Sequence, residues 1–215
     1  MYLSLFDPSF FGEIPPHLSN LSRLIHLDLH YNRDLYPQNL DWVSSLSSLK
    51  YLDMRRLNLS GVGENWLTAI NMLPALLEKL EHLDLHGNEK ITGQLPSCFG
   101  NLCKLKTLDL SGNNFSGNID GFLGNLSTCL NNNLESLAFH SNKLIGKIPD
   151  SLGIFGSLRQ LSLGYNFFGG SIPASIGKLS SLQLLHLSYK EMNGTIPKSI
   201  GQLSELVTLL LDNNS

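Results

Sequence analysis

The sequence predicts an α/β solenoid, a fold in which one short structural unit repeats along an axis and each unit packs against its neighbours. Three observations predict it. A leucine-anchored segment recurs with a period near 24 residues, as from Leu158 to Leu182. Leucines alternate with polar residues in LDLSGNN, which is the period of a strand with one buried face. Glycine, asparagine and proline then follow at fixed places and end that strand.

The repeat units cover nearly the whole chain. The best copies begin at Leu105, Leu158 and Leu182, and looser copies begin at Leu24, Leu49, Leu80 and Leu134. Partial copies begin at Leu3 and Leu206, so we expect one domain over residues 1–215 with about eight coils, truncated at both ends. The intervals Leu59 to Leu80 and Ser127 to Leu134 exceed one coil and predict local irregularities.

Each coil is expected to open with one short strand. Stacked coils place these strands in parallel about 4.8 Å apart, so a single parallel sheet is predicted along one wall. The motif apolar-x-Gly-x-Ile/Leu-Pro, as in LIGKIP ending at Pro149, then predicts a tight bend and an aliphatic core plug. The stretch that follows, as in ASIGKLSSLQ, predicts a turn of helix on the outer wall.

An asparagine closes most of these strands, where the backbone turns away from the sheet. Its side chain has both a donor and an acceptor, so it can satisfy backbone groups that cannot reach water. We therefore expect an inward asparagine ladder, broken at Leu57 and Lys190 and with Pro8 in its first place. The ladder residues are Asn32, Asn88, Asn113, Asn142, Asn166 and Asn214.

Composition excludes several classes of partner. Charged residues make up 15% of the chain, and a net charge of -3 with a pI near 6.1 provides no basic field for nucleic acid. No apolar run approaches the roughly 18 residues that span a bilayer, and the opening segment has no signal-peptide pattern. Cys98, Cys103 and Cys129 form no CxxC pair and have no histidine at zinc-ligand spacing. They leave open one disulfide with one odd thiol, or three free thiols, and we favour the disulfide.

The outward positions of the strands are the candidate binding surface. One column reads Asp28, Asp53, Asp84, Asp109, Ala138, Ser162, His186 and Leu210, and the next reads His30, Arg55, His86, Ser111, His140, Gly164, Ser188 and Asp212. The first half is charged and the second is mostly neutral. The alternative interpretation is a solvated sheet face without a partner. The predicted binding residues are Asp28, His30, Tyr31, Asp53, Arg55, Arg56, Asp84, His86, His140, Tyr165, His186 and Tyr189.

Metal binding and catalysis are not expected. One coil lies between the pair His26 and His30 and the pair His82 and His86, so the two pairs are expected roughly 10 Å apart. No serine or cysteine can be assigned a base and an oxyanion site by spacing, and phosphate loops are absent. We therefore expect no metal, no cofactor and no enzyme activity.

Six N-x-Ser/Thr sequons lie in or near predicted turns and outer connections, which favours a glycosylated, secreted protein. The alternative is that NLS and NFS are by-products of the repeat template. The sequons begin at Asn20, Asn58, Asn114, Asn125, Asn193 and Asn213.

The composite motif LxxLxxLxLSxNxLxGxIPxxLGxLxx resembles the plant-specific subclass of leucine-rich repeats. This resemblance implies a right-handed superhelix with one parallel β-sheet on the concave face and short 3-10 or loop segments on the convex face. Segments such as GEIPPHLSNLSRLIHLDLHYN, NLDWVSSLSSLKYLDM and CFGNLCKLKTLDLSGNNFSG look like the ectodomain of plant receptor-like proteins of the ethylene-inducing-xylanase receptor type. The chain departs from that family in having no signal peptide, cysteine-paired cap or membrane span.

The resemblance implies a place on the extracellular side of the plasma membrane, in the apoplast, and a role in defence. We therefore predict recognition of a protein or peptide ligand and of a co-receptor, in plant defence or signalling. One alternative is a soluble inhibitor of a microbial cell-wall hydrolase, because polygalacturonase inhibitors resemble this repeat subclass throughout. The other is a gene fragment with no independent function.

Overall fold

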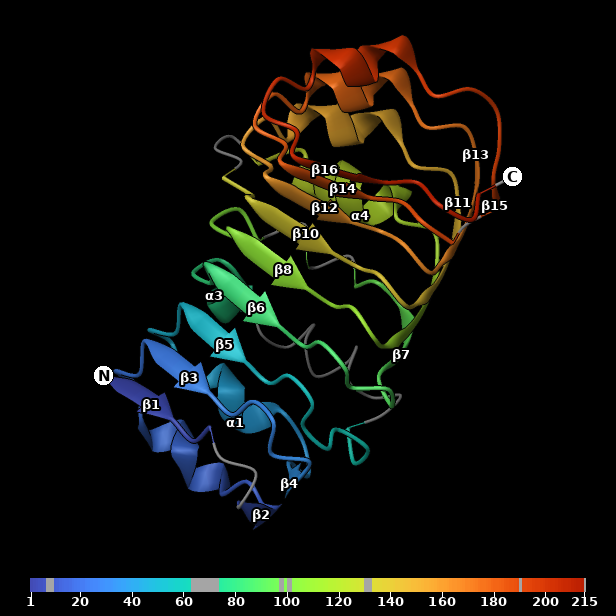
Figure 1. Cartoon of the computed structure of the whole chain (residues 1–215). Helices are drawn as coiled ribbons and strands as arrows, with labels where there is room; N and C mark the ends of the chain where they lie inside the picture. Colours follow the sequence, from blue (N-terminus) through green and yellow to red (C-terminus); the bar gives the residue numbers. More distant parts are fainter. Residues whose placement is uncertain are drawn as a thin grey trace.

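A nine-stranded parallel sheet runs the length of the molecule in the computed structural model (Figure 1). The structure describes residues 1–6, 10–62, 74–96, 99, 102–129, 133–189 and 191–214. Each strand of this sheet has three residues, and each coil adds one strand beside the last. In sheet order the strands are β1 (Tyr2–Ser4), β3 (His26–Asp28), β5 (Tyr51–Asp53), β6 (His82–Asp84), β8 (Thr107–Asp109), β10 (Ser136–Ala138), β12 (Gln160–Ser162), β14 (Leu184–His186) and β16 (Thr208–Leu210).

The register of this sheet follows the leucine pattern. The central residue of each strand is a leucine, and each pairs with the leucine of the next coil, as Leu52 with Leu83 and Leu83 with Leu108. These central leucines are 1% exposed or less from Leu27 to Leu185. The predicted parallel wall of a leucine-rich solenoid is therefore confirmed. Because strand residues alternate between faces, the residues before and after each central leucine point outward.

A second, lateral sheet was not predicted. The apolar-x-Gly segments, expected only as bends, pair with one another in a five-stranded parallel sheet beside the first (Figure 1). Its glycines still make the bend: Gly146 and Gly170 have φ of +90° and +76°, conformations that disfavour other residues. The strands are β7 (Thr92–Gln94), β9 (Asn114–Gly117), β11 (Lys143–Gly146), β13 (Phe167–Gly170) and β15 (Glu191–Met192), and β2 (Phe11–Glu13) pairs with β4 (Asp34–Tyr36) separately.

Short helices form the outer wall opposite the nine-stranded sheet, as predicted (Figure 1). Within the described residues, four are single 3-10 segments that start directly after the motif proline, which is the N-cap and has an extended backbone. They are η1 (Pro16–Asn20), η4 (Asp150–Ile154), η5 (Ala174–Lys178) and η6 (Lys198–Gln202). Three other described segments are α-helical, namely α1 (Asp41–Ser44), α3 (Pro74–Leu77) and α4 (Asp120–Leu126).

The two predicted irregularities have different outcomes. Residues 63–73 of the first interval lie outside the described part of the chain, yet β5 and β6 on either side of it are direct neighbours. The second interval contains Cys129, which forms a disulfide with Cys103. Cys103 and Cys129 are therefore bonded as a disulfide, the alternative that we favoured, and are not free thiols. Cys98 lies outside the described residues.

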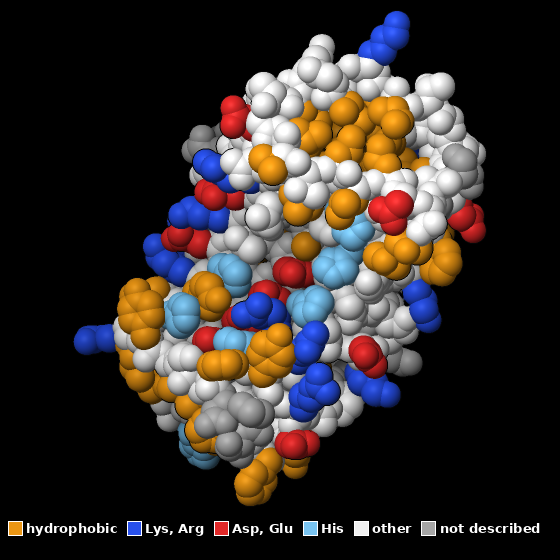
Figure 2. Space-filling model, in the orientation of Figure 1, with side chains coloured by type: hydrophobic (Ala, Val, Ile, Leu, Met, Phe, Trp, Pro, Cys, Tyr) orange, Lys and Arg blue, Asp and Glu red, His pale blue; other side chains and the backbone are white. Residues whose placement is uncertain are grey.

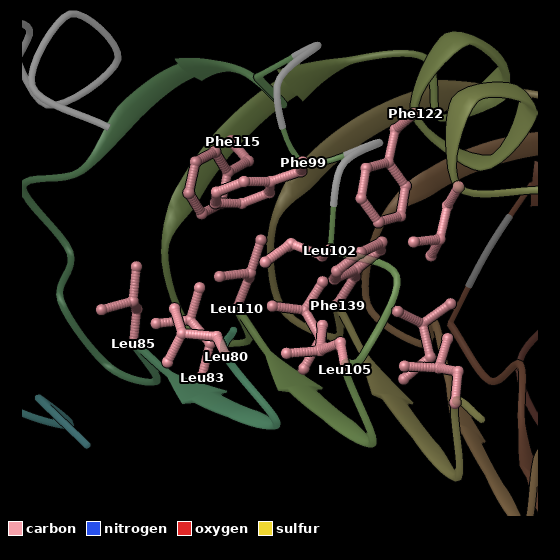
Figure 3. Close-up of a cluster of buried hydrophobic side chains, with 14 of the residues drawn as sticks. Leu80, Leu83, Leu85, Phe99, Leu102, Leu105, Leu110, Phe115, Phe122 and Phe139 are labelled. Atoms are coloured by element: carbon pink, nitrogen blue, oxygen red, sulfur yellow. The ribbon is translucent and has the colours of Figure 1, made fainter. Parts of the chain in front are cut away.

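The core between the two walls is continuous from coil to coil. Leucines in and just after the strands of the nine-stranded sheet meet phenylalanines from other parts of the coils, as Figure 3 shows for Leu83, Leu110 and Phe115. Phe122 contacts Phe99 and Phe139 edge to face, with ring centroids 6.4 and 5.5 Å away. Of these six side chains, all except Phe122 are 1% exposed or less. Such burial contributes about 1.5–3 kcal/mol per side chain, so it holds the wall rigidly in place.

Candidate functional site

The outward side chains of the nine-stranded sheet form the concave wall, which has three columns. The register aligns the middle column as the sequence predicts, with Asp28, Asp53, Asp84 and Asp109 as successive partners. A third column lies two residues after it, and a first column lies two residues before it. The first column is Tyr2, His26, Tyr51, His82, Thr107, Ser136, Gln160, Leu184 and Thr208.

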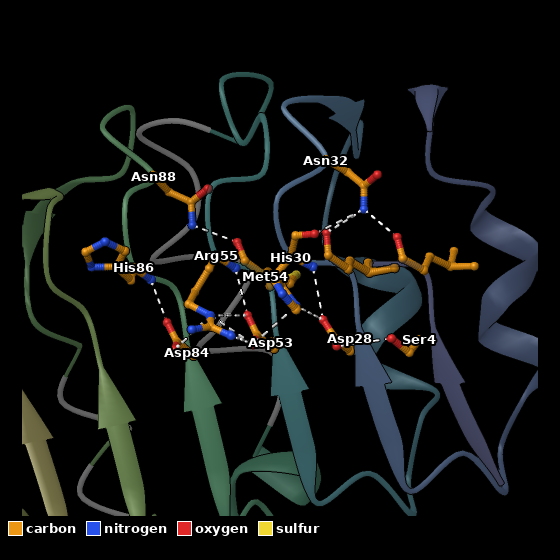
Figure 4. Close-up of polar contacts among 12 residues, drawn as sticks. Ser4, Asp28, His30, Asn32, Asp53, Met54, Arg55, Asp84, His86 and Asn88 are labelled. Atoms are coloured by element: carbon orange, nitrogen blue, oxygen red, sulfur yellow. Dashed lines mark hydrogen bonds and ion pairs between the residues drawn. The ribbon is translucent and has the colours of Figure 1, made fainter. Parts of the chain in front are cut away.

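Arg55 is the central cation of the charged half of the wall (Figure 4). Its Nε lies 3.0 and 2.9 Å from the two carboxylate oxygens of Asp53, and its Nη2 lies 2.7 Å from Oδ2. The same Nε lies 3.2 Å from Oδ2 of Asp84. Asp53 is fully buried beneath this guanidinium, so its charge is matched in place. The hydrogen bond with Asp53 raises the pKa of Arg55 further above neutrality.

Asp28 has a different partner. The His30 imidazole and the His30 backbone N–H both donate to Asp28 Oδ1, and the Ser4 hydroxyl donates to Oδ2 at 3.1 Å (Figure 4). Burial acts to raise the pKa of Asp28, but these hydrogen bonds outweigh it and hold the pKa below its usual value. The carboxylate is therefore anionic at neutral pH.

Asp84 and Asp109 are less well compensated than Asp28 and Asp53. Burial raises its pKa to about 7, helped by the negative charges of Asp109 and Asp53 and opposed by the His86 N–H and by Arg55. Asp109 accepts the Ser111 backbone N–H at 2.8 Å. Among the ion pairs of the described residues, none includes Asp109. The wall thus has an excess of negative charge where β6 meets β8.

Histidines extend from this point towards the neutral half. The rings of His86 and His140 lie 5.8 Å apart, and those of His140 and His186 lie 6.4 Å apart. Their side chains approach because small residues separate them: Ser111 lies between the coils of His86 and His140, and His186 covers Gly164. A Cβ on Gly164 would lie 2.6 Å from the His186 Nε2. Burial lowers the pKa of His140.

The residue before each ladder position has a left-handed backbone. Tyr31, Arg56, Tyr165 and Tyr189 have φ between +51° and +64° there, a region that strains side-chain-bearing residues. The Arg56 guanidinium lies 5.1 Å from the Tyr31 ring centroid, and the Tyr165 and Tyr189 rings stack at 4.2 Å. All three tyrosines are 39% to 47% exposed. This strained turn therefore presents aromatic rings at the rim of the wall.

Sequence reasoning missed one feature of the wall, the aromatic stack of the first column. His26 stacks on Tyr51 at 3.9 Å, and Tyr51 stacks on His82 at 4.1 Å. Tyr2 approaches the far side of His26 at 5.3 Å. The recurring triplets HLD, YLD and HLD contained the signal, because aligned strands bring their first residues together.

The asparagine ladder supports the rim from inside. Each ladder asparagine donates from Nδ2 to a carbonyl three residues before it and to the equivalent carbonyl of the preceding coil, as Asn88 does to Leu85 at 2.8 Å and to Met54 at 2.9 Å. Figure 4 shows this for Asn32 and Asn88. Asn113, Asn142, Asn166 and Asn214 follow the same pattern. Leu57 has no such side chain, and its N–H donates to Asn88 Oδ1 instead. The two other predicted interruptions, Pro8 and Lys190, lie outside the described residues.

The six sequons lie away from the strands of the nine-stranded sheet. Asn20 and Asn125 are exposed on the outer helices η1 and α4, and Asn114 lies in the lateral strand β9. Asn58 and Asn193 lie in irregular segments outside the helices and strands, and Asn213 lies at the left-handed position beside the wall. Glycans at the five sites other than Asn213 would leave the concave wall uncovered.

Two groups of described side chains have three potential metal-ligand atoms within 4.8 Å of one another, and both contain Asp53. They are Asp28, His30 and Asp53, and Asp53, His82 and Asp84. Arg55 already binds both oxygens of Asp53, so an added divalent cation would have to displace an ion pair. This chemistry favours an electrostatic surface over a metal centre.

Charged and histidine side chains gather in the hollow over the central strands, while fewer lie over the C-terminal strands (Figure 2). Within the described residues, no helix has the length and apolar character needed to cross a bilayer. The predicted site residues thus occupy one continuous surface, with the charged group around Arg55 and the stacked tyrosines at separate ends.

Comparison with known proteins agrees with this architecture. A family model described as leucine rich repeats in two copies matches residues 78–125, and a leucine rich repeat model matches residues 133–155 and 157–179. Receptor like protein 28 of Arabidopsis thaliana is 32% identical over 183 residues, covering 77% of this chain and 22% of that protein. Receptor-like protein EIX1 of Solanum lycopersicum is 34% identical over 169 residues, covering 77% of this chain and 15% of that protein.

Solved structures give the same result for the fold. The crystal structure of a TDR receptor is 29% identical with a TM-score of 0.83, covering all of this chain and 35% of that one. The Arabidopsis receptor kinase HAESA, in complex with the peptide hormone IDA and the co-receptor SERK1, is 27% identical with a TM-score of 0.66, covering 99% of this chain and 42% of that one. The chain spans 14% to 22% of the length of the curated relatives that it matches. It is a plant-specific leucine-rich repeat protein that resembles part of the ectodomain of plant receptor-like proteins.

Proposed function

We propose that the concave wall recognises a peptide or protein ligand on the extracellular side of the plasma membrane, in plant defence or signalling, and that a co-receptor joins the complex. The observation that carries the proposal is the row of exposed tyrosines held at positive φ beside the wall. A strained backbone that exposes a large ring is unfavourable for folding alone, and such strain gathers at binding sites. Tyrosine is also a frequent anchor of protein interfaces.

Other observations support the same surface. The outward residues that line the wall are not constrained by packing in the core. Five of the six sequons lie away from the wall. The HAESA complex contains a peptide hormone and a co-receptor, and its receptor chain has the same fold. The ligand of this chain and its role in defence are part of the proposal. Catalysis is not part of the proposal.

The experiment compares two pairs of exposed side chains of similar area, one beside the concave wall and one on the lateral sheet. The chain is immobilised and exposed to peptides from plant extracellular fluid, and bound peptides are identified and resynthesised for titration. Replacing Tyr165 and Tyr189 by alanine should weaken binding at least tenfold. The matched control replaces Ile145 and Phe167, which are 52% and 54% exposed on the lateral sheet, and should leave binding unchanged.

A ligand whose affinity depends on the lateral pair and not on the tyrosines would move the recognition surface away from the wall. An inhibitor of a microbial cell-wall hydrolase is the second candidate, since it too would use an exposed solenoid face. Inhibition of a polygalacturonase by the chain alone, without any peptide ligand, would favour it.

A further inference from the structure

The charge on the wall is unevenly matched, and this difference identifies the chemistry of a ligand. Arg55 binds both oxygens of Asp53, and His30 donates to Asp28, so these two carboxylates have cationic or proton-donating partners. Asp84 shares the Arg55 guanidinium through a single atom at 3.2 Å. Asp109, one strand further, takes part in no ion pair among the described residues.

Two polar atoms beside these carboxylates are also unmatched. Ser111 is fully buried, and its hydroxyl has no hydrogen-bond partner among the described residues. The Nδ1 of His86 is likewise buried without a partner in that part of the chain. Ser111 occupies an outward position, its N–H donates to Asp109, and the rings of His86 and His140 lie on either side of it at a separation of 5.8 Å. A buried hydroxyl without a partner is unfavourable, so this position favours a bound group that can hydrogen-bond.

We propose that a cationic side chain of the ligand, an arginine or a lysine, binds over Asp84 and Asp109 beside the His86 and His140 rings. This proposal rests on the proposed function of the wall. A guanidinium has five N–H donors, so it can donate to Asp109 and to a second acceptor of this cluster. It also stacks favourably on aromatic rings, and the two imidazoles border the position. The neutral C-terminal half of the wall would then contact the uncharged part of the same ligand.

Proton binding at the same place supports the proposal. The groups that face Asp84 are Asp53 and Arg55 on one side, Asp109 on the other, and His82 and His86 on its own coil, with His140 beyond Asp109. Burial is the largest cause that raises the pKa of Asp84 to about 7, and the negative charges of Asp109 and Asp53 add to it. Those two charges also attract a ligand cation, and a proton on Asp84 opposes that attraction.

The test uses the whole chain with labelled histidines and two matched probes. The first probe is the capped tripeptide acetyl-Gly-Arg-Gly-amide, and the second has citrulline in place of arginine, which keeps the shape and removes the charge. Nuclear magnetic resonance should show saturable shifts of the His86 and His140 ring signals with the arginine probe and none with citrulline. Asp109→Asn should weaken the arginine probe about tenfold, as loss of one charged hydrogen bond predicts.

The controls separate binding from folding. Asparagine at position 109 still accepts the Ser111 N–H, so the fold should persist, and Asp150→Asn in η4 on the outer wall should leave probe affinity unchanged. Lowering the pH through about 7 should weaken the arginine probe, because Asp84 takes up a proton and loses its negative charge.

Three results would overturn the proposal: equal shifts with citrulline, no effect of Asp109→Asn, or saturable shifts of the same rings by calcium chloride alone, which would indicate a metal site. A natural ligand that depends on Tyr165 and not on Asp109 would also overturn it while leaving the proposed function intact. Conversely, an arginine probe that binds while no extracellular peptide binds the wall would retain the cation site and reject the receptor function.

Discussion

The N-terminal and C-terminal halves of the concave wall have the same frame and opposite surface chemistry. The strands of the nine-stranded sheet share three-residue length, parallel register and a central leucine in both halves, from β1 to β8 and from β10 to β16. The middle column is aspartate from β3 to β8 and then becomes Ala138, Ser162, His186 and Leu210. The inward positions determine the fold, so the outward positions were free to diverge. This difference explains why one frame can present a charged and a neutral surface side by side.

The two halves also use different contacts to hold their outward side chains. In the charged half, Arg55 and His30 bind carboxylates, and stacked rings of His26, Tyr51 and His82 border them. In the neutral half, Ser188 donates to Asp212 at 2.5 Å and Tyr165 stacks on Tyr189. If the frame is common and only the surface differs, changes to the ladder should have equal effects in both halves, and changes to the columns should not.

The largest effect is expected from the ladder, at its members next to an interruption. Among the described residues, Asn88 is the sole side-chain donor to the Met54 carbonyl, and it accepts the Leu57 N–H. Within the same part of the chain, Asn166 is the sole side-chain donor to the Leu163 carbonyl, and it accepts the Leu144 N–H. Replacing either by leucine leaves one buried carbonyl and one buried N–H unpaired, which should reduce the free energy of unfolding by about 4 kcal/mol. Urea denaturation measures it.

Asn113 is the matched control for this prediction. Its three carbonyl acceptors keep other donors, since Leu85 is also bound by Asn88, Leu110 by Asn142 and Ser111 by the Gly87 N–H. Asn113→Leu should therefore be clearly less destabilising than Asn88→Leu. Equal losses for all three variants would mean that packing volume, and not hydrogen bonding, determines the role of the ladder. Unequal losses for Asn88 and Asn166 would show that the frame differs between halves.

A second effect, of similar size but confined to the charged half, is expected from Asp84. Its pKa rises from 3.8 to about 7 on folding, so the folded state binds the proton more tightly than the unfolded chain does. Stability from this group is complete below pH 3.8 and is lost as the pH rises through about 7, by up to about 4 kcal/mol at 1.36 kcal/mol per unit. Asp84→Asn should remove that decline.

The control for this comparison is Asp212→Asn in the neutral half, where the carboxylate is exposed. Thermal or urea unfolding at several pH values compares the wild type with both variants. If the decline of stability with pH persists unchanged in Asp84→Asn, another group causes it. The wall would then have no excess of negative charge at Asp84.

Much of this comparison could be predicted from the sequence, because the inward and outward positions alternate regularly. The leucine pattern predicts the parallel wall, and it places Asp28, Asp53 and Asp84 in one column with the observed register. The position of each ladder asparagine after two inward residues likewise predicts the inward hydrogen bonds of Asn88 and Asn113.

What could not be predicted depends on contacts between coils. The lateral sheet forms from strands of two to four residues with no alternation to reveal them, such as Glu191–Met192. The stack of His26, Tyr51 and His82 joins residues far apart in sequence, each of which is ordinary at the start of a strand. The Cys103–Cys129 pairing closes across an insertion whose path the repeat period does not determine.

The smallest effect on stability, and the clearest separation of stability from binding, is expected at Tyr165. Its φ of +52° strains any side chain, and its ring gains contact energy by stacking on Tyr189. Tyr165→Ala keeps the strain and loses the stack, which should reduce the free energy of unfolding by about 1 kcal/mol. Tyr165→Gly loses the same stack but relieves about 1 kcal/mol of left-handed strain, so its stability should be close to that of the wild type. Both variants should lose ligand affinity equally if the ring is an anchor, and titration of a wall ligand measures this. Glycine as destabilising as alanine would show that the turn is unstrained, and the argument that connects its geometry to recognition would then fail.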